Sequence, residues 1–226
     1  VEVHDNRVTN AAVERETYQA SSLQWNSGNS GWVFNNHFSG GVSADLQVGC
    51  TGGDSYFYAN VFDDDNGLYI HGGLSDGPGY YVFANTIMAE QSDAIRLNRS
   101  GGSNNCSGVT LSTTSLTRLL ALNNLALLLD GHGAYSLVAG DPTGLTELVT
   151  PNLVRDQGDL ADLCLADPAG GDFRVICTTS PALDGSGADL SGEPMLRLWE
   201  LPMGVVTDLT GRVMDHPGRY GAYQAN

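Results

Sequence analysis

The chain has 226 residues with 10 basic and 26 acidic side chains, a formal net charge of −16, and every basic residue is an arginine. Nucleic acids and anionic membranes are held by clustered basic side chains, so an acidic chain without such a cluster argues against both as the main partner. The 29 glycines and the charged fraction of 16% indicate a turn-rich protein rather than a helical bundle. No run of about 18 apolar residues occurs, so no membrane-spanning helix is predicted.

A weak internal repeat runs through the first half of the chain. Its template is apolar, any, small or polar, Asn, any, apolar, and the copies are Val3–Val8, Val33–Phe38, Phe57–Phe62 and Val82–Ile87. The shared asparagines are Asn6, Asn36, Asn60 and Asn85, at spacings of 30, 24 and 25 residues, with a looser copy around Asn124. Apolar pairs recur between the copies: Leu23/Trp25, Leu46/Val48, Leu68/Ile70 and Ile95/Leu97.

A unit of about two dozen residues with short strands and polar turns cannot close its own core, whereas stacked units can, which predicts a parallel β-solenoid. The first and last positions of the template then point inward. At a bend between strands, the repeated Asn would tolerate a left-handed backbone and hydrogen-bond to the Asn one coil away. A β-sandwich with coincidental Asn turns is the alternative.

The Asn-centred repeats resemble those of right-handed parallel β-helix proteins of the pectate-lyase-like superfamily. Residues 180–187 resemble the "SPAIDAG" pattern at the C-terminal end of secreted bacterial members, and residues 207–212 and 218–223 resemble the "D-x-x-G-x-R" and "D-I-G-A-Y-E" patterns that follow. The chain has Leu183 for Ile, departs after Asp184, and reads Arg219-Tyr220 for Asp-Ile. We therefore expect an all-β, right-handed parallel β-helix, with coils in residues 1–130 and the last coil and a loop-rich cap in 131–226.

Val1, the start of the chain, already lies inside the first repeat. We expect that further coils or another domain precede it in a precursor, or that another chain packs against it. An uncovered solenoid end exposes core side chains and strand edges, which makes it an expected association site.

Strand alternation predicts an outward aromatic face beside the inward apolar positions. Its members are Trp32, Phe34, Tyr56, Tyr58, Tyr81 and Phe83. Three interpretations stay open: a protein interface, a polysaccharide groove, or side chains covered by residues 131–226 of the same chain or belonging to the core. An exposed patch of this kind would mark a binding surface.

A second outward face follows the apolar pairs and contains Tyr69, His71 and Arg96. Carboxylates precede it at Asp63, Asp64, Asp65, Glu90 and Asp93. In pectate-lyase-like enzymes, stacked carboxylates hold Ca²⁺ and an Arg or Lys removes a proton. The resemblance thus implies a possible Ca²⁺ site at Asp63–Asp65, with Arg96 as base and Tyr69 or His71 assisting. An ordinary polar turn explains the same acidic run.

Four cysteines allow three pairings, and none has zinc-site spacing. Their distribution favours Cys50–Cys106 and Cys164–Cys177 over four free thiols. Disulfides would place the protein outside the cytoplasm, secreted or at a cell surface.

The leading hypothesis is a secreted or surface-exposed structural or adhesive β-helix that associates through its first coil and its aromatic face. The alternatives are a Ca²⁺-assisted lyase or hydrolase acting on an acidic polysaccharide, and a non-catalytic carbohydrate-binding module.

Overall fold

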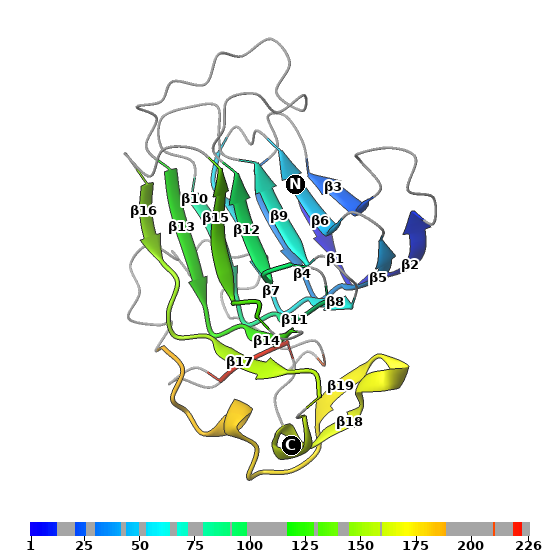
Figure 1. Ribbon diagram of the computed structural model, residues 1–226. Coiled ribbons are helices and arrows are strands. Elements are labelled where there is room, and N and C mark those ends of the chain that lie inside the picture. Colours follow the sequence, from blue (N-terminus) through cyan, green and yellow to red (C-terminus); the bar gives the residue numbers. More distant parts are fainter. Residues whose placement is uncertain are drawn as a thin grey trace.

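The chain folds into three parallel β-sheets that wind around a shared core (Figure 1). The computed structural model describes residues 1–12, 21–25, 30–41, 44–49, 53–63, 67–71, 79–90, 92–98, 117–128, 131–139, 145–158, 160–188, 210 and 219–222. The strands follow one another in the order sheet A, sheet B, sheet C, and each sheet pairs strands of successive coils. The predicted all-β solenoid is therefore confirmed.

Sheet A contains β1 (Glu2–His4), β4 (Gly31–Phe34), β7 (Ser55–Tyr58), β10 (Gly79–Phe83), β13 (Thr117–Leu122) and β16 (Leu145–Leu148). Sheet B contains β2 (Arg7–Ala12), β5 (His37–Gly41), β8 (Val61–Asp63), β11 (Thr86–Ala89), β14 (Leu125–Leu128) and β17 (Leu153–Asp156). Sheet C contains β3 (Ser21–Trp25), β6 (Ala44–Gly49), β9 (Leu68–His71), β12 (Ile95–Asn98) and β15 (Tyr135–Ala139). Because β15 completes the coil begun by β13, the coils continue past residue 130.

The inward positions of the repeat form the core. Register-matched strands stack them in one row through sheet A and another through sheet B. The buried members of the predicted inward set are Val33, Phe57, Val82, Phe38, Phe62 and Ile87, while Val3 and Val8 of the first coil are partly buried. Burying each such side chain fully stabilises the fold by about 1.5–3 kcal/mol. The predicted inward pattern is confirmed.

The corner between sheets A and B is made by two residues in every coil except the last, where residues 149–152 join β16 to β17. In the two-residue corners, the residue before the repeat asparagine has a positive φ: Asp5, Asn35, Ala59, Ala84 and Asn123 lie between 52° and 57°. The prediction that the repeat asparagine itself adopts the left-handed conformation is therefore wrong. The strained residue precedes it, and the asparagine side chain instead bonds to neighbouring coils.

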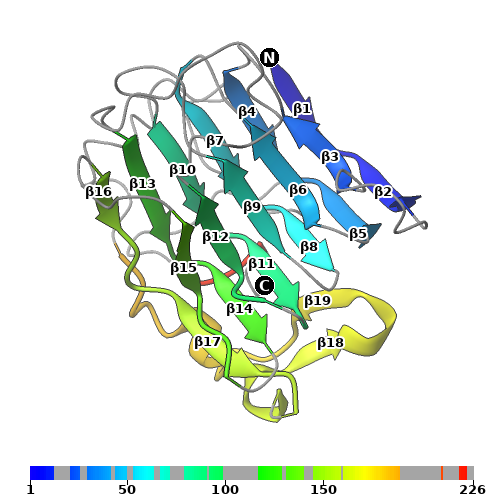
Figure 2. The same ribbon diagram turned by 45° about the horizontal axis from the view of Figure 1, so that its top comes forward.

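The C-terminal part of the chain covers the outer face of sheet B (Figures 1 and 2). Its elements are η2 (Ala161–Leu163), β18 (Leu165–Asp167), η3 (Pro168–Gly170), β19 (Asp172–Val175) and η4 (Pro181–Leu183), with β18 and β19 antiparallel. Leu163, Phe173 and Val175 pack with the outward-facing Val61, Leu125 and Leu127 of sheet B. We call residues 160–188 and 219–222 the cap.

The first and third C-terminal patterns lie together in the cap, whereas residues 207–212 are outside the described residues except for Thr210. Backbone N–H groups donate from Tyr220 to Ala182 O at 2.9 Å, from Gly221 to Asn123 O at 3.0 Å, and from Ala222 to Thr86 Oγ1 at 3.0 Å. Gly221 has φ +87°, and a Cβ there would lie 3.1 Å from Leu125 Cβ. Glycine is required because its backbone is left-handed and packed against the sheet. These motif residues therefore fasten the cap.

Candidate functional site

The repeat asparagines form a continuous chain of hydrogen bonds along the solenoid. In each coil the backbone N–H and the Nδ2 group of one asparagine both donate to Oδ1 of the asparagine in the next coil. The pairs are Asn6 to Asn36, Asn36 to Asn60, Asn60 to Asn85, Asn85 to Asn124 and Asn124 to Asn152, at 2.9–3.1 Å. We call this row the asparagine ladder. Every bond runs from the asparagine of one coil to that of the next, so the donors face one end of the solenoid and the acceptors face the other.

The side-chain amides also bind the backbone of the preceding coil. Asn36 Nδ2 donates to Val3 O at 2.9 Å, and Asn60 Nδ2 donates to Val33 O at 2.9 Å. Asn36, Asn60 and Asn85 have no exposed surface, so each buried amide is satisfied by protein groups. The ladder thereby fixes the vertical register of neighbouring coils.

Sequence reasoning gave Asn124 only as a loose copy and missed Asn152. A signal for Asn152 was present, because Val149–Val154 fits the repeat template with Pro151 at the small or polar position. The long insertion between Asn85 and Asn124, 39 residues apart, obscured the period.

Within the described residues, the first coil is the outermost coil at one side of the ladder and of the sheets. Within the described residues, nothing donates to Asn6 Oδ1, and Asn6 is exposed. Strands β1, β2 and β3 each pair with a described strand on one side only. Val3, Val8 and Leu23 are partly buried, in contrast to the core residues behind them. This end therefore combines open strand edges, an open amide oxygen and half-exposed apolar side chains. We call residues 1–12 and 21–25 the first-coil edge.

The predicted aromatic face lies on the outer side of sheet A, but it is not exposed. One stack joins His4, Phe34, Tyr58 and Phe83, with ring centroids 4.8, 5.0 and 5.1 Å apart. The other joins Trp32, Tyr56 and Tyr81, at 6.1 and 4.6 Å. Five of the six predicted binding residues are at most 3% exposed, and Trp32 is partly buried. Of the three interpretations, the structure therefore supports side chains covered within the chain, not an open binding surface.

The aromatic stacks form a second apolar layer with Leu120 and Leu122. Ala188 of the cap packs against this layer. Two hydrogen bonds hold Ala188 there: Asn123 Nδ2 donates to Ala188 O at 2.8 Å, and Ala188 N–H donates to Asn123 Oδ1 at 2.7 Å. Burial raises the pKa of the Tyr58 hydroxyl above its ordinary value, and the negative charges of Glu2 and Asp5 raise it further. The layer therefore behaves as interior.

Two of the predicted catalytic residues meet on the outer side of sheet C. The Arg96 guanidinium lies 4.7 Å from the centroid of the Tyr69 ring, and strands β9 and β12 hold the two residues in register. Burial lowers the pKa of Arg96, while Tyr69 and Asp93 oppose that shift. His71 pairs with Asn98 at the end of β9. Asp93 Oδ1 accepts a hydrogen bond from Gly133 N–H at 2.6 Å, which ties the preceding turn to the next coil.

Asp63 lies apart from that cluster, at the end of β8 in sheet B. Its Oδ2 is 3.5 Å from His37 Nε2, and Gly171 of the cap lies close to both side chains. Asp64 and Asp65 are outside the described residues, and Glu90 is exposed. Among the described residues, no three His, Cys, Asp or Glu side chains are grouped as metal ligands would be. Asp63 and Arg96 of the predicted enzyme site thus belong to different sheets, whereas Asp93 lies close to Arg96.

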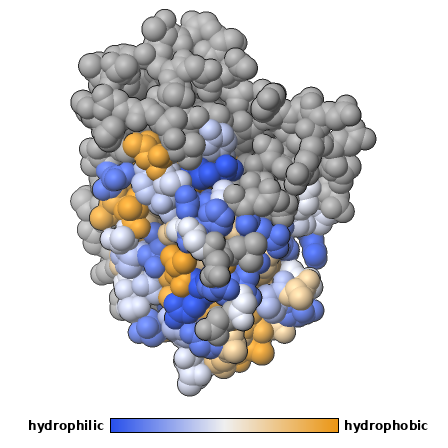
Figure 3. Space-filling model, in the orientation of Figure 1, coloured by the Kyte–Doolittle hydropathy of each residue, from blue (hydrophilic) through white to orange (hydrophobic). Residues whose placement is uncertain are grey.

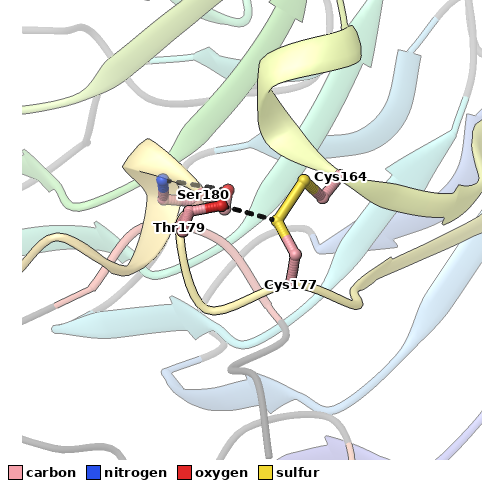
Figure 4. The surroundings of a disulfide bond; sticks show 5 residues. Cys164, Cys177, Thr179 and Ser180 are labelled. Carbon is pink, nitrogen blue, oxygen red and sulfur yellow. Dashed lines mark hydrogen bonds between the residues drawn. A yellow bond between two sulfur atoms is a disulfide. The ribbon is translucent and has the colours of Figure 1, made fainter.

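One predicted disulfide is confirmed. Cys164 and Cys177 are bonded, with Cα atoms 5.7 Å apart, and the bridge lies beside Thr179 and Ser180 at the start of η4 (Figure 4). Ser180 Oγ accepts a hydrogen bond from Ala182 N–H at 3.3 Å, so bridge and turn hold one segment of the cap. The predicted Cys50–Cys106 pair lies outside the described residues.

No described helix has the length and apolar character needed to cross a membrane. No family model, curated protein or solved structure matches the chain.

Proposed function

We propose that this protein is a secreted or cell-surface structural module, without catalytic activity of its own, that associates end-on through its first-coil edge. The partner is a parallel β-coil that carries an asparagine at the ladder position. The first-coil edge is the observation that carries this proposal. One more coil of the same kind would supply partner strands for its open edges, hydrogen-bond donors for its amide oxygen and cover for its apolar side chains.

Each component of this edge favours pairing. Open strand edges are templates for another strand, and natural proteins usually block them with charges, prolines, bulges or a covering segment. The first-coil edge carries exposed charges and a register shift in β2, but it contains no proline, and its inward residues Val3 and Val8 are apolar. A docked coil would bury these side chains and provide donors for Asn6 Oδ1. The buried apolar area and the hydrogen bonds gained by the open strands and by Asn6 Oδ1 would therefore both stabilise the association.

Two features support a location outside the cytoplasm. The Cys164–Cys177 disulfide is of the kind that persists in oxidising compartments. The resemblance of residues 180–187 and 218–223 to the ends of secreted β-helix proteins points the same way. Export, and kinship with the pectate-lyase-like superfamily, are parts of this proposal.

The enzyme and carbohydrate-binding hypotheses have less support. The buried aromatic layer offers no described flat ring to a sugar except the partly buried Trp32. Asp63 is paired with His37 on sheet B, whereas Arg96 and Tyr69 lie on sheet C. We therefore do not advance a polysaccharide substrate or a Ca²⁺-assisted reaction.

Sedimentation velocity of the full chain over a wide concentration range tests the proposal. We expect concentration-dependent association that Val8→Lys abolishes, because a lysine would be buried against the docked coil. Ile176→Lys is the matched control. It makes the same change of charge at an apolar side chain of the cap that is 67% exposed, and it should associate like the wild type. A wild-type chain that is monomeric throughout, or a Val8→Lys variant that is folded by circular dichroism and associates normally, would overturn the proposal.

A further inference from the structure

In sheets A and B, the last described coil offers the partner strands that β1 and β2 of the first-coil edge lack. Resting on the proposed function, we infer that the partner coil is the last coil of a second copy of this chain, docked head-to-tail. The last coil contains β16 and β17 and the end of the asparagine ladder at Asn152. Both strands pair with a described strand on one side only. Figures 1 and 2 show these strands and the first coil at opposite ends of the solenoid.

The polarity of the ladder makes its two ends complementary. At the first coil, Asn6 Oδ1 is an acceptor that receives no described donor. At the last coil, Asn152 Oδ1 accepts from Asn124, while the backbone N–H of Asn152 has no described acceptor. In every interior coil that same N–H donates to the next asparagine's Oδ1. A second copy placed after Asn152 would supply the acceptor as its own Asn6.

The backbone continues the same pattern. In the interior, the N–H after each ladder asparagine donates to the carbonyl of the previous asparagine, as His37 N–H does to Asn6 O at 2.8 Å. Arg7 N–H occupies the position of His37 N–H in the first coil, and Asn152 O occupies the position of Asn6 O in the last coil. Head-to-tail docking would therefore join Arg7 N–H of the second copy to Asn152 O. Parallel strand direction is preserved across this junction.

The apolar side chains at the two ends also belong to one row. The inward row of sheet B runs from Val8 through Phe38, Phe62, Ile87 and Ala126 to Val154. Its interior members are buried, whereas Val8 is partly buried and Val154 is 38% exposed. Docking would place Val154 of one copy against Val8 of the next and complete the row.

Among the described residues, three of the four exposed large apolar side chains lie in the first or last coil. The three are Val1, Leu148 and Val154, and the fourth, Ile176, lies in the cap. On the face seen in Figure 3, described hydrophobic residues form small groups separated by hydrophilic ones. The described surface thus points to the ends as the self-complementary regions.

Ladder polarity also distinguishes this arrangement from a two-fold dimer. Two first-coil edges brought face to face would set Asn6 Oδ1 against Asn6 Oδ1, an acceptor against an acceptor. Head-to-tail contact is heterologous, so it leaves one free end of each kind and continues into an open row of copies. Because each copy carries a charge of −16, long-range repulsion opposes assembly, and added salt should strengthen it by screening.

The experiment combines one variant at each end. Val8→Lys blocks the first-coil edge and leaves the last coil intact, and Val154→Lys does the reverse. We expect each variant alone to sediment as a monomer. An equimolar mixture should form a dimer and nothing larger, because only one compatible pair of ends remains. Ile176→Lys, with the same change of charge in the cap, should assemble like the wild type.

The outcomes separate this inference from the proposed function. If Val8→Lys abolishes association but Val154→Lys does not, the first-coil edge is an association site and the head-to-tail partner is wrong. If neither variant changes association, both are wrong. Should Val8→Lys fail to fold, Asn6→Ala replaces it, since Asn6 is exposed. That variant should weaken assembly by about tenfold through the lost acceptor, and unchanged assembly would overturn the inference.

Discussion

The outer face of sheet B and the first-coil edge both present apolar side chains of parallel strands, but only the first is covered by a described part of the chain. The chain's own cap covers the first: Leu163 and Phe173 pack on Leu125 and Leu127, and Gly221 is fastened to Asn123. No described segment covers the second. The asparagine ladder shows the same contrast, because Asn60 has no exposed surface and Asn6 is exposed. The repeat sequence thus specifies which hydrogen bonds each coil is able to make, and the position of the coil in the solenoid decides whether a neighbouring coil completes them.

The largest expected effect breaks the ladder in a buried coil. Asn60→Ala removes the acceptor for Asn36 N–H and the donors to Val33 O and Tyr58 O. Because these groups are buried, we expect a loss of roughly 3 kcal/mol in the free energy of unfolding. Asn6→Ala, at the first-coil edge, should cost less than about 1 kcal/mol. Urea denaturation measures both, and equal losses would contradict the contrast between buried and edge coils.

Removing the Cys164–Cys177 disulfide tests whether the packing of the cap on sheet B depends on this covalent bond. The bridge closes a loop between residues 13 apart. The double substitution Cys164→Ala and Cys177→Ala should therefore lower the free energy of unfolding by about 3 kcal/mol in the chain-entropy model. Self-association should be unchanged, since the cap shares no residue with the first-coil edge or with β16 and β17. A loss of association in this variant would show that the two regions are coupled.

A smaller effect tests the fastening of the cap at Gly221. Gly221→Ala introduces a Cβ close to Leu125 in a left-handed backbone, and we expect a loss of roughly 1–3 kcal/mol in the free energy of unfolding. Gly131→Ala is the matched control, because Gly131 has φ +89° but nothing within 4 Å of the added Cβ. The difference between the two variants in thermal denaturation reports packing alone. Identical losses would mean that the cap does not press on sheet B there.

The smallest effect concerns the covered aromatic layer at high pH. The raised pKa of Tyr58 means that the folded state keeps this proton after the unfolded state loses it. The contribution to stability is complete below about pH 10, the ordinary tyrosine value, and is lost as the pH rises above it. Tyr58→Phe should therefore reduce the fall in stability between pH 9 and pH 10.5 by about 0.8 kcal/mol. Urea midpoints at both pH values measure it, and an unchanged slope would place Tyr58 in contact with water.

Local patterns in the sequence predicted the coils of the solenoid and their inward residues. Val33, Phe38, Phe57 and Phe62 point inward because strand alternation and the Asn-centred corner recur in every coil. What the pattern missed depends on residues far apart in the chain. The outward aromatic layer is buried, with Ala188 of the cap packed against it, and Asp63 meets His37 rather than Arg96 because β8 belongs to sheet B.

The sequence by itself determined the stacked coils, the inward rows and one disulfide, since each follows from the identity and spacing of nearby residues. Only the tertiary structure decided which outward rows are buried, which residue of each corner takes the left-handed backbone, and that the ladder has direction. Burial and hydrogen-bond direction depend on what lies in the neighbouring coil or in the cap. A template of six residues contains no information about either.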